Sequence, residues 1–435
     1  MHESCMSPHQ GDWGCTKEVT SESKLVHTNP SKSLLQFVNP NHMPTRTSMP
    51  IKIGVLYSRT GVTSLVERTQ LHAIQLAMEE INAAGGVLGR ELALVCLDPA
   101  STPGNYPGMA EKLIREQGVR LIMGCHMSST RKAVIPIVER YNALLFYATP
   151  YEGFEYSRNV FYAGAAPNQN ILPLASYMLS HHGTRVAMVG SDYVCPYESN
   201  RIMSELIQER GGEKAHERYL PLNATLSDFR AVANQIKALS PDFIFSTVVG
   251  AGNTDLHRAL AEVGLSPMEA PVASHMCGET DIAAIGVDLA EGLITCASYF
   301  QSLNTAENNR VVARYKARFG ENHNTNVCWE AAYFQTHLIA KALAQSGSED
   351  PTLLAQVLPG LEFDAPQGRV RIDEQNNHTY LHPKIGRCNS MGQFDVLASA
   401  SDLVRADPFV VAHTAPLWTN ATHPVGEGAE QGAMP

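Results

Sequence analysis

Residues 51–57 read Ile-Lys-Ile-Gly-Val-Leu-Tyr, and this stretch decides the fold. A short, nearly continuous apolar run is typical of a strand that is buried on both faces of a sheet. A Ser-Arg-Thr-Gly turn follows, and apolar side chains then recur at helical spacing over residues 64–84 until Gly85-Gly86 ends the helix. A buried strand that leads through a short turn into a helix is typical of a parallel sheet covered by helices.

The same alternation continues along most of the chain, and it restarts once. In the first part it predicts strands over residues 93–97, 120–125 and 144–148, and helices over residues 106–117 and 129–141. After residues 159–164 it predicts helices over 168–182, 198–211, 226–239 and 253–263, and strands over 185–190, 217–220, 242–249 and 271–275. Two more helices, over 307–319 and 327–345, precede β-rich sequence in which 368–372 and 379–387 are expected to form a hairpin.

These patterns predict an α/β protein with two doubly wound parallel-sheet lobes joined by a hinge. A chain of 435 residues exceeds what one core usually organises. We expect residues 1–48 to be a disordered leader, 49–163 plus about 297–350 to form lobe 1, 164–296 plus about 351–405 to form lobe 2, and 406–435 to form a tail. Ligands of parallel sheets sit beyond the carboxyl ends of the strands, so the predicted ligand site is the cleft between the lobes.

Composition excludes several classes of function. Hydrophobic residues make up 44% and charged residues 17% of the chain, as in globular proteins, and the net charge of −10 disfavours direct binding to nucleic acid or to an anionic membrane. The nine cysteines are odd in number and show no CxxC spacing, which favours a reducing compartment. The first 49 residues lack a basic start followed by a long apolar centre, so we expect no secretory signal and a cytoplasmic location.

The predicted strand ends in the first lobe carry hydroxyl groups. Ser128 or Ser129 is a natural helix N-cap, where free backbone N–H groups can bind a carbonyl or carboxylate oxygen. Tyr147 and Thr149 can present hydroxyls to a ligand, and Pro150 stiffens the same turn. Taken alone, a plain helix cap is the better explanation of Ser128 and Ser129, and an ordinary proline turn is the alternative for the second group.

The second lobe and the acidic residues leave similar alternatives. Tyr193 follows a predicted buried strand and either covers the ligand or packs at the sheet edge. Glu152, Glu155 and Asp192 fall near the expected cleft but also fit capping or surface positions. Three hydroxyl-rich strand ends at equivalent places together favour a small-molecule site.

No pattern of an enzyme, metal or cofactor site is present. The sequence has no GxGxxG after the first strand, no P-loop and no GxSxG elbow. Cys125 and His126 are neighbours, but neighbours along a chain rarely form a nucleophile–base pair. His275 and Cys277 lack further ligands at metal spacing, so a satisfied or exposed histidine is expected there. We therefore expect no cofactor, no metal and no enzymatic activity.

Seven short runs resemble one family, the amide-sensing negative regulators of aliphatic amidase operons. They are Thr130-Arg131-Lys132-Ala133-Val134, Thr149-Pro150-Tyr151-Glu152-Gly153-Phe154-Glu155-Tyr156-Ser157, Ala166-Pro167-Asn168-Gln169-Asn170, Gly190-Ser191-Asp192-Tyr193, Ser246-Thr247-Val248-Val249-Gly250, Asp364-Ala365-Pro366-Gln367-Gly368 and Gln375-Asn376-Asn377-His378. These regulators are relatives of the urea and short-chain amide receptors of ABC transporters, in the type I periplasmic binding-protein superfamily. The resemblance extends over residues 51–411.

The resemblance implies a clam-shell receptor that binds a small amide and holds an RNA-binding antiterminator silent until the amide releases it. Ligand contacts would come from Ser128, Tyr147, Thr149 and Pro150 in lobe 1 and from Tyr193 in lobe 2. The chain departs from the family at two positions, because His126 and Cys195 stand where the family has tyrosine. Both changes would widen the pocket and alter its hydrogen-bond donors, which favours a larger or aromatic amide. The resemblance leaves open whether the protein is a homo-oligomer.

Two other functions remain in competition. An ABC-transporter receptor for urea, short-chain amides or branched amino acids shares the fold, and an amino-acid ligand would need a buried carboxylate such as Asp192 or Glu152 opposite its ammonium group. A cysteine-dependent amide or nitrile hydrolase would use Cys125 or Cys195, but the sequence offers no organised catalytic set.

Overall fold

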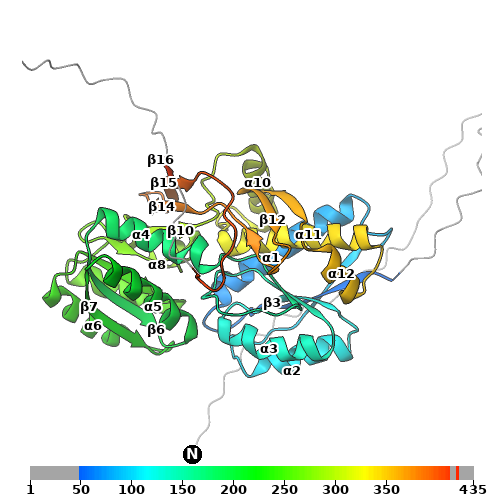
Figure 1. Cartoon of the computed structure of the whole chain (residues 1–435), viewed down its shortest axis with the longest axis horizontal. Helices are drawn as coiled ribbons and strands as arrows, with labels where there is room; N and C mark the ends of the chain where they lie inside the picture. Colours follow the sequence, from blue (N-terminus) through cyan, green and yellow to red (C-terminus); the bar gives the residue numbers. More distant parts are fainter. Residues whose placement is uncertain (1–48, 412–417, 421–435) are drawn as a thin grey trace, which may run out of the picture. The chain divides into compact units, whose positions relative to one another are not determined.

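The computed structural model describes residues 49–411 and 418–420 (Figure 1). The predicted leader over residues 1–48 and most of the predicted tail lie outside the described residues. Within the described part, no helix combines the length and apolar character that crossing a membrane requires.

The first sheet is entirely parallel, as predicted, and has the strand order β2-β1-β3-β4-β5. Its strands are β1 (Ile51–Leu56), β2 (Leu92–Cys96), β3 (Leu121–Gly124), β4 (Leu144–Tyr147) and β5 (Val160–Tyr162). The helices that accompany it are α1 (Ser64–Ala83), α2 (Asn105–Arg115), α3 (Ser128–Arg140), α10 (Ala306–Phe319) and α11 (Val327–Ser346). The first strand and helix are packed into one core with the later α11, which includes the fully buried Trp329.

The second sheet is mixed, which differs from the predicted parallel lobe. Its order is β16-β15-β14-β10-β9-β8-β6-β7, and the strands from β14 to β16 are antiparallel to their neighbours. Its strands are β6 (Arg185–Ser191), β7 (Glu213–Leu220), β8 (Phe243–Thr247), β9 (Val272–Ala273), β10 (Ile294–Ala297), β14 (Lys384–Cys388), β15 (Phe394–Ala400) and β16 (Trp418–Asn420). Its helices are α4 (Ile171–His181), α5 (Val194–Glu209), α6 (Leu226–Leu239), α7 (Ala251–Glu262), α8 (Glu279–Ile285) and α9 (Val287–Ala290), preceded by the 3₁₀ turn η1 (Pro167–Gln169).

The segment over residues 351–381 belongs to the first lobe, which corrects the predicted domain boundary. Leu354, Val370 and Leu381 are buried in the same core as β1 and α11. This segment forms α12 (Pro351–Val357) and a small antiparallel sheet of β11 (Glu362–Ala365), β12 (Gly368–Ile372) and β13 (Thr379–Tyr380). The predicted hairpin is therefore shorter than expected, because the chain leaves it after β13 and β14 joins the second sheet.

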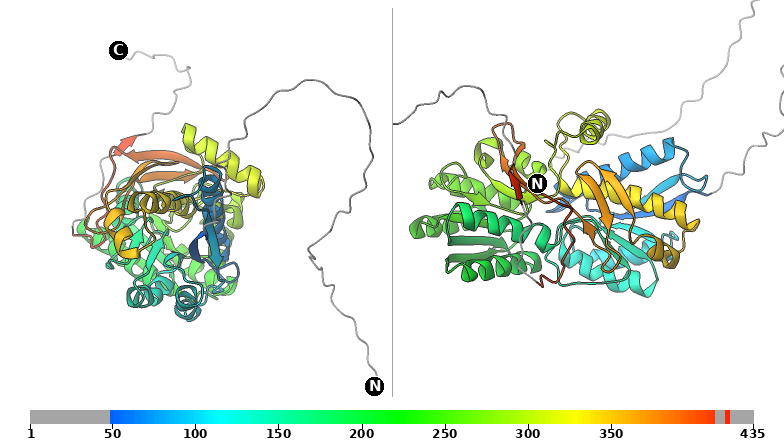
Figure 2. Two further views of the ribbon diagram at one scale, coloured as in Figure 1. Left: turned by 90° about the vertical axis from the view of Figure 1, so that its right-hand side faces the viewer. Right: turned by 45° about the horizontal axis from the view of Figure 1, so that its top comes forward.

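The chain passes between the two lobes more than once. The right-hand view of Figure 2 shows the blue-to-cyan elements and the green elements as two groups, with the yellow α11 beside the blue elements. Residues after β15 also return to the first lobe, where Ala406 is buried in the core beside β3 and β4. The start of the predicted tail therefore contacts both lobes, since Ala406 and Pro408 contact lobe 1 and Val410 packs against the core of lobe 2.

Candidate ligand-binding site

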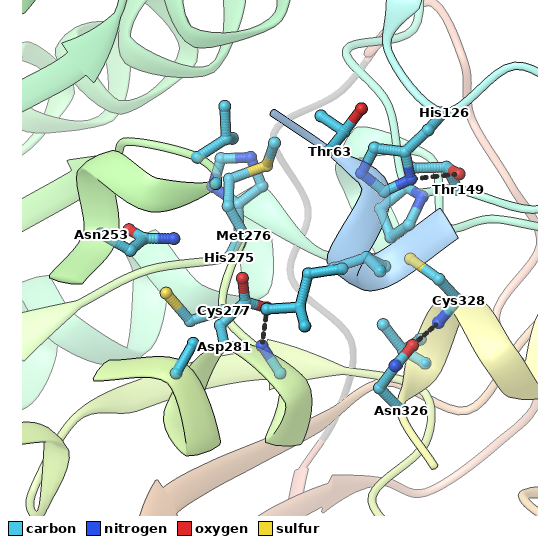
Figure 3. A pocket seen from close by; sticks show the side chains of 18 of the residues that line it. Thr63, His126, Thr149, Asn253, His275, Met276, Cys277, Asp281, Asn326 and Cys328 are labelled. Carbon is cyan, nitrogen blue, oxygen red and sulfur yellow. Dashed lines mark hydrogen bonds between the residues drawn. The ribbon is translucent and has the colours of Figure 1, made fainter. Parts of the chain in front are cut away.

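A pocket of about 300 Å³ lies where the two lobes meet. Its lobe-1 wall comes from residues 62–66 at the start of α1, from the ends of β3 and β4, and from residues 326–328 at the start of α11. Its lobe-2 wall comes from residues 249–254 at the start of α7 and from the segment around α8 and β10. Figure 3 shows side chains from both walls around this pocket. The site is therefore at the carboxyl ends of the strands, where the fold class predicts it.

Three longer helices, α1, α7 and α11, begin at the pocket. Helix N-termini carry unpaired N–H groups and a partial positive charge, so they attract carbonyl and carboxylate oxygens. The lining residues of the described structure include no lysine or arginine. Any attraction of the pocket for a carbonyl oxygen thus comes from backbone dipoles, although Asn326 already accepts from two of the first N–H groups of α11.

Buried polar atoms on the lobe-2 wall have no hydrogen-bond partner in the described structure. They are Nδ2 and Oδ1 of Asn253, Nδ1 of His275 and Oγ1 of Thr295. The three residues are 2%, 7% and 1% exposed, and all line the pocket. An unpaired buried polar group costs about 1–3 kcal/mol. A polar ligand in the pocket would remove this cost.

His126 lines the pocket, and one of its ring nitrogens is left as a free acceptor. Gln70 is fully buried and its Nε2 donates to the carbonyl oxygen of Ala148 at 3.0 Å, so its Oε1 faces His126 Nδ1 at 3.2 Å. Because Oε1 only accepts, Nδ1 must carry a proton. Burial lowers the pKa of His126 to about 4, so the ring is neutral at pH 7 and Nε2 is left with a lone pair.

The turn before His126 has an unusual backbone conformation at Cys125. Cys125 has φ of 68°, in the left-handed region that non-glycine residues rarely adopt, and its N–H donates to the carbonyl oxygen of Leu56 at 3.1 Å. On the adjacent strand end, the Tyr147 hydroxyl donates to the carbonyl oxygen of His126 at 2.7 Å. The loop that carries His126 is therefore fixed by both neighbouring strands.

One carboxylate, Asp281, lies among the described lining residues. It accepts a hydrogen bond from the Gly278 N–H at 3.1 Å, and burial raises its pKa to about 6. This residue replaces Glu152 and Asp192 as the acidic candidate for an ammonium group. Glu152 is engaged with Arg131 and Ser128, and Asp192 is exposed and accepts from Tyr197.

The predicted site residues fall into two groups. His126, Thr149 and Pro150 line the pocket. The remaining four are Ser128, Tyr147, Tyr193 and Cys195, and they lie outside its lining, around the buried Glu152. Direct ligand contact by these four residues stays a prediction.

Glu152 belongs to a buried ion network centred on Arg131. The Arg131 guanidinium is fully buried and pairs with Glu155 at 2.7 Å and with Glu152 at 3.3 Å. It also lies over the rings of Tyr147 and Tyr151, at 4.5 and 4.6 Å from their centroids. The positive charge of Arg131 holds the pKa of Glu155 below its usual range despite burial. This network fixes the strand ends behind the pocket.

Asn326 connects elements of both lobes at the edge of the pocket. Its Oδ1 caps α11 by accepting from the N–H groups of Cys328 and Trp329, both at 2.9 Å (Figure 3). Its Nδ2 donates to Thr69 on α1 at 2.9 Å and to Thr280 on α8 at 2.7 Å. Every hydrogen-bonding atom of this side chain is used.

We expect the Asn326→Ala change to lower the free energy of unfolding by about 2 kcal/mol, because it removes a helix cap and two side-chain hydrogen bonds. Asp350→Ala is the matched control, since Asp350 caps α12 through Thr352 and Leu353 without contacting the other lobe. The control should lose about 1 kcal/mol in urea denaturation. Equal losses in the two variants would show that the bonds to Thr69 and Thr280 contribute nothing.

The two cysteines considered for catalysis are unsuited to nucleophilic attack. Burial raises the pKa of both the Cys125 and the Cys195 thiol above its ordinary value. A thiol that stays protonated is a poor nucleophile, and the His126 ring faces Gln70. Among the described residues, no group of three or more His, Cys, Asp or Glu is placed to hold a metal ion.

Comparison with known proteins places the fold in a family. The Periplasmic binding protein domain family matches residues 51–415. The Leu/Ile/Val-binding protein homolog 6 of Brucella abortus is 24% identical over 336 residues, covering 75% of this chain and 85% of the relative. The leucine-, isoleucine-, valine-, threonine-, and alanine-binding protein of Pseudomonas aeruginosa is 24% identical over 332 residues, covering 75% of this chain and 87% of the relative.

Solved structures show the same fold. An ABC-transporter solute-binding protein from Rhodopseudomonas palustris HaA2, in complex with p-hydroxybenzoic acid, superposes with a TM-score of 0.75 at 21% identity, covering 84% of this chain and 100% of that chain. The predicted fold class, two α/β lobes of the type I periplasmic-binding-protein kind, is confirmed. This chain belongs to the periplasmic binding protein domain family.

Proposed function

We propose that this chain is a solute-binding receptor of the transporter type, which encloses a small neutral solute bearing an amide group between its lobes. The observation that carries the proposal is the set of unpaired polar atoms that line the pocket, on Asn253, His275 and Thr295. All three groups are uncharged at pH 7, because burial lowers the pKa of His275 to about 3.

A neutral amide matches these groups better than an ion does. It offers one carbonyl acceptor and N–H donors, which suit the backbone N–H groups at the helix starts and the acceptor of His126. A charged carboxylate would enter a pocket whose described lining has no cationic side chain and contains Asp281. A zwitterionic amino acid is the competing ligand, since Asp281 could face its ammonium group.

The names of the relatives support the proposal that this chain is a receptor of the transporter type. The two curated proteins reported above are named as amino-acid-binding proteins, and the solved structure is a solute-binding protein of an ABC transporter. The finer prediction, an amide sensor that controls an RNA-binding antiterminator in the cytoplasm, rests on the sequence resemblance alone. Copurification of the antiterminator with the ligand-free chain, and its release by amide, would favour that regulator.

The test is a thermal-shift panel on the full chain with acetamide, propionamide, benzamide, urea, p-hydroxybenzoate and leucine. A ligand at a hundredfold its Kd adds about 2.7 kcal/mol of stability, which is readily measured. We expect amides to stabilise the protein and the two carboxylates to have little effect. Stabilisation by leucine alone would replace the amide by an amino acid, and no stabilisation by any of the six would overturn the proposal.

A further inference from the structure

We infer that the Asn253 side chain forms two hydrogen bonds with the solute, at an edge where a carbonyl oxygen and an N–H lie side by side. The inference rests on the proposed function and names the group that would select the amide. Asn253 was not among the residues that the sequence marked as candidates. It is the third residue of α7 and lies on the lobe-2 wall of the pocket (Figure 3).

The amide of Asn253 is an exception among the buried asparagines. Asn326 uses both ends of its side chain, and so does Asn308, whose Oδ1 accepts from Tyr299 and whose Nδ2 donates to the carbonyl oxygens of Gln301 and Leu303. Within residues 49–411 and 418–420, Asn253 is the asparagine with both polar atoms buried and without a hydrogen bond of ordinary geometry. Its amide does lie close enough to the Asp281 carboxylate to offset part of the rise in the pKa of Asp281 that burial causes. The amide nitrogen carries two hydrogens, so one N–H remains for a ligand. Because Asn253 lines the pocket, a ligand bound there could supply the missing hydrogen-bond partners.

The chemistry of a free carboxamide defines that partner. The oxygen and nitrogen lie in one plane, so Asn253 offers one acceptor and one donor side by side. A primary amide, a urea or a lactam presents the complementary pair on one edge and can form two hydrogen bonds at once. A ketone or an ester supplies the carbonyl acceptor alone and leaves Oδ1 of Asn253 unpaired. Sites built around such a pair reject analogues that lack one member.

The matched probes are propionamide and butanone, which differ in shape only by the exchange of NH₂ for CH₃. Titration calorimetry on the full chain would give the ratio of their dissociation constants for the wild type and for Asn253→Leu. The wild type should prefer propionamide, and the variant should reduce that preference at least about tenfold, because leucine keeps the volume and removes both polar atoms. Asn253→Ala serves as the second variant if the leucine side chain prevents folding.

Asn234→Leu is the matched control, because Asn234 is exposed on α6 outside the pocket lining and its Nδ2 donates to the carbonyl oxygen of Arg230 at 2.8 Å. Its preference for propionamide should equal that of the wild type. An unchanged preference in both Asn253 variants would overturn the inference and leave the amide receptor standing. A wild type that binds neither propionamide nor any other amide of the panel would overturn both.

Discussion

Replacing Arg131 by methionine is expected to lower the free energy of unfolding by about 3–5 kcal/mol. Methionine keeps much of the volume but leaves Glu152 and Glu155 without the guanidinium that neutralises them. Lys132 would still contact both carboxylates, at 3.8 and 3.0 Å, but it is 42% exposed and is screened by solvent. Urea denaturation at pH 7.5 measures the loss.

The control is Arg318→Met, which removes an ion pair of similar geometry at the surface. Arg318 and Glu79 approach to 3.0 Å and are 51% and 46% exposed, so this change should cost less than about 1 kcal/mol. A loss below about 1 kcal/mol for Arg131→Met as well would contradict the structural role of the network.

The effect of Arg131 should also depend on pH in a defined direction. In the wild type the pKa of Glu155 lies below its usual value, so the stability it contributes is present at neutral pH and is lost as the pH falls through the folded pKa. Without Arg131 the buried carboxylate would have a raised pKa, so the variant regains stability on acidification. The difference between wild type and variant should therefore shrink as the pH is lowered.

The order of the strands and helices could be predicted from the sequence, because each element has its own local pattern of apolar residues. The apolar run over residues 51–57 and the helical spacing over 64–84 correspond to β1 and α1 within one or two residues. The allocation of residues 351–381 could not be predicted in this way. These residues form short strands and one short helix, and only the contacts of side chains such as Leu354 and Val370 decide which core they join.

The candidate site could also be predicted only in part, namely where its residues directly follow predicted strands. His126, Thr149 and Pro150 follow strand ends, and the fold class places strand ends at the cleft. Asn253 and His275 obey the same rule, but their residue types are common, and an unpaired atom is visible only when every neighbour is known. The sequence interpretation of His275 as a satisfied or exposed histidine holds for one ring nitrogen, since His275 is buried and its Nε2 lies 3.2 Å from the Ser199 hydroxyl, while its Nδ1 lacks a partner among the described residues.

Replacing His126 by phenylalanine is expected to weaken binding of the amide about a hundredfold. Phenylalanine fills the same space but removes the Nε2 acceptor, so an amide N–H would be buried without a partner. His126→Gln should restore much of the affinity, because its side-chain oxygen can accept the same hydrogen bond. His181→Phe, on the exposed end of α4, should bind as the wild type does. Equal affinity of His126→Phe and the wild type would remove His126 from the site.

The pH profile distinguishes an acceptor role of His126 from a purely steric one. The pKa of His126 is about 4, so Nε2 accepts a hydrogen bond throughout the neutral range and loses that ability only when the ring becomes protonated in acid. Binding by the wild type should therefore weaken below about pH 5 through this group, and the same component should be missing in His126→Phe. Asp281, with a pKa of about 6, titrates in both proteins and cancels from the comparison. If the two profiles are parallel down to pH 4, His126 shapes the pocket without accepting a hydrogen bond from the ligand.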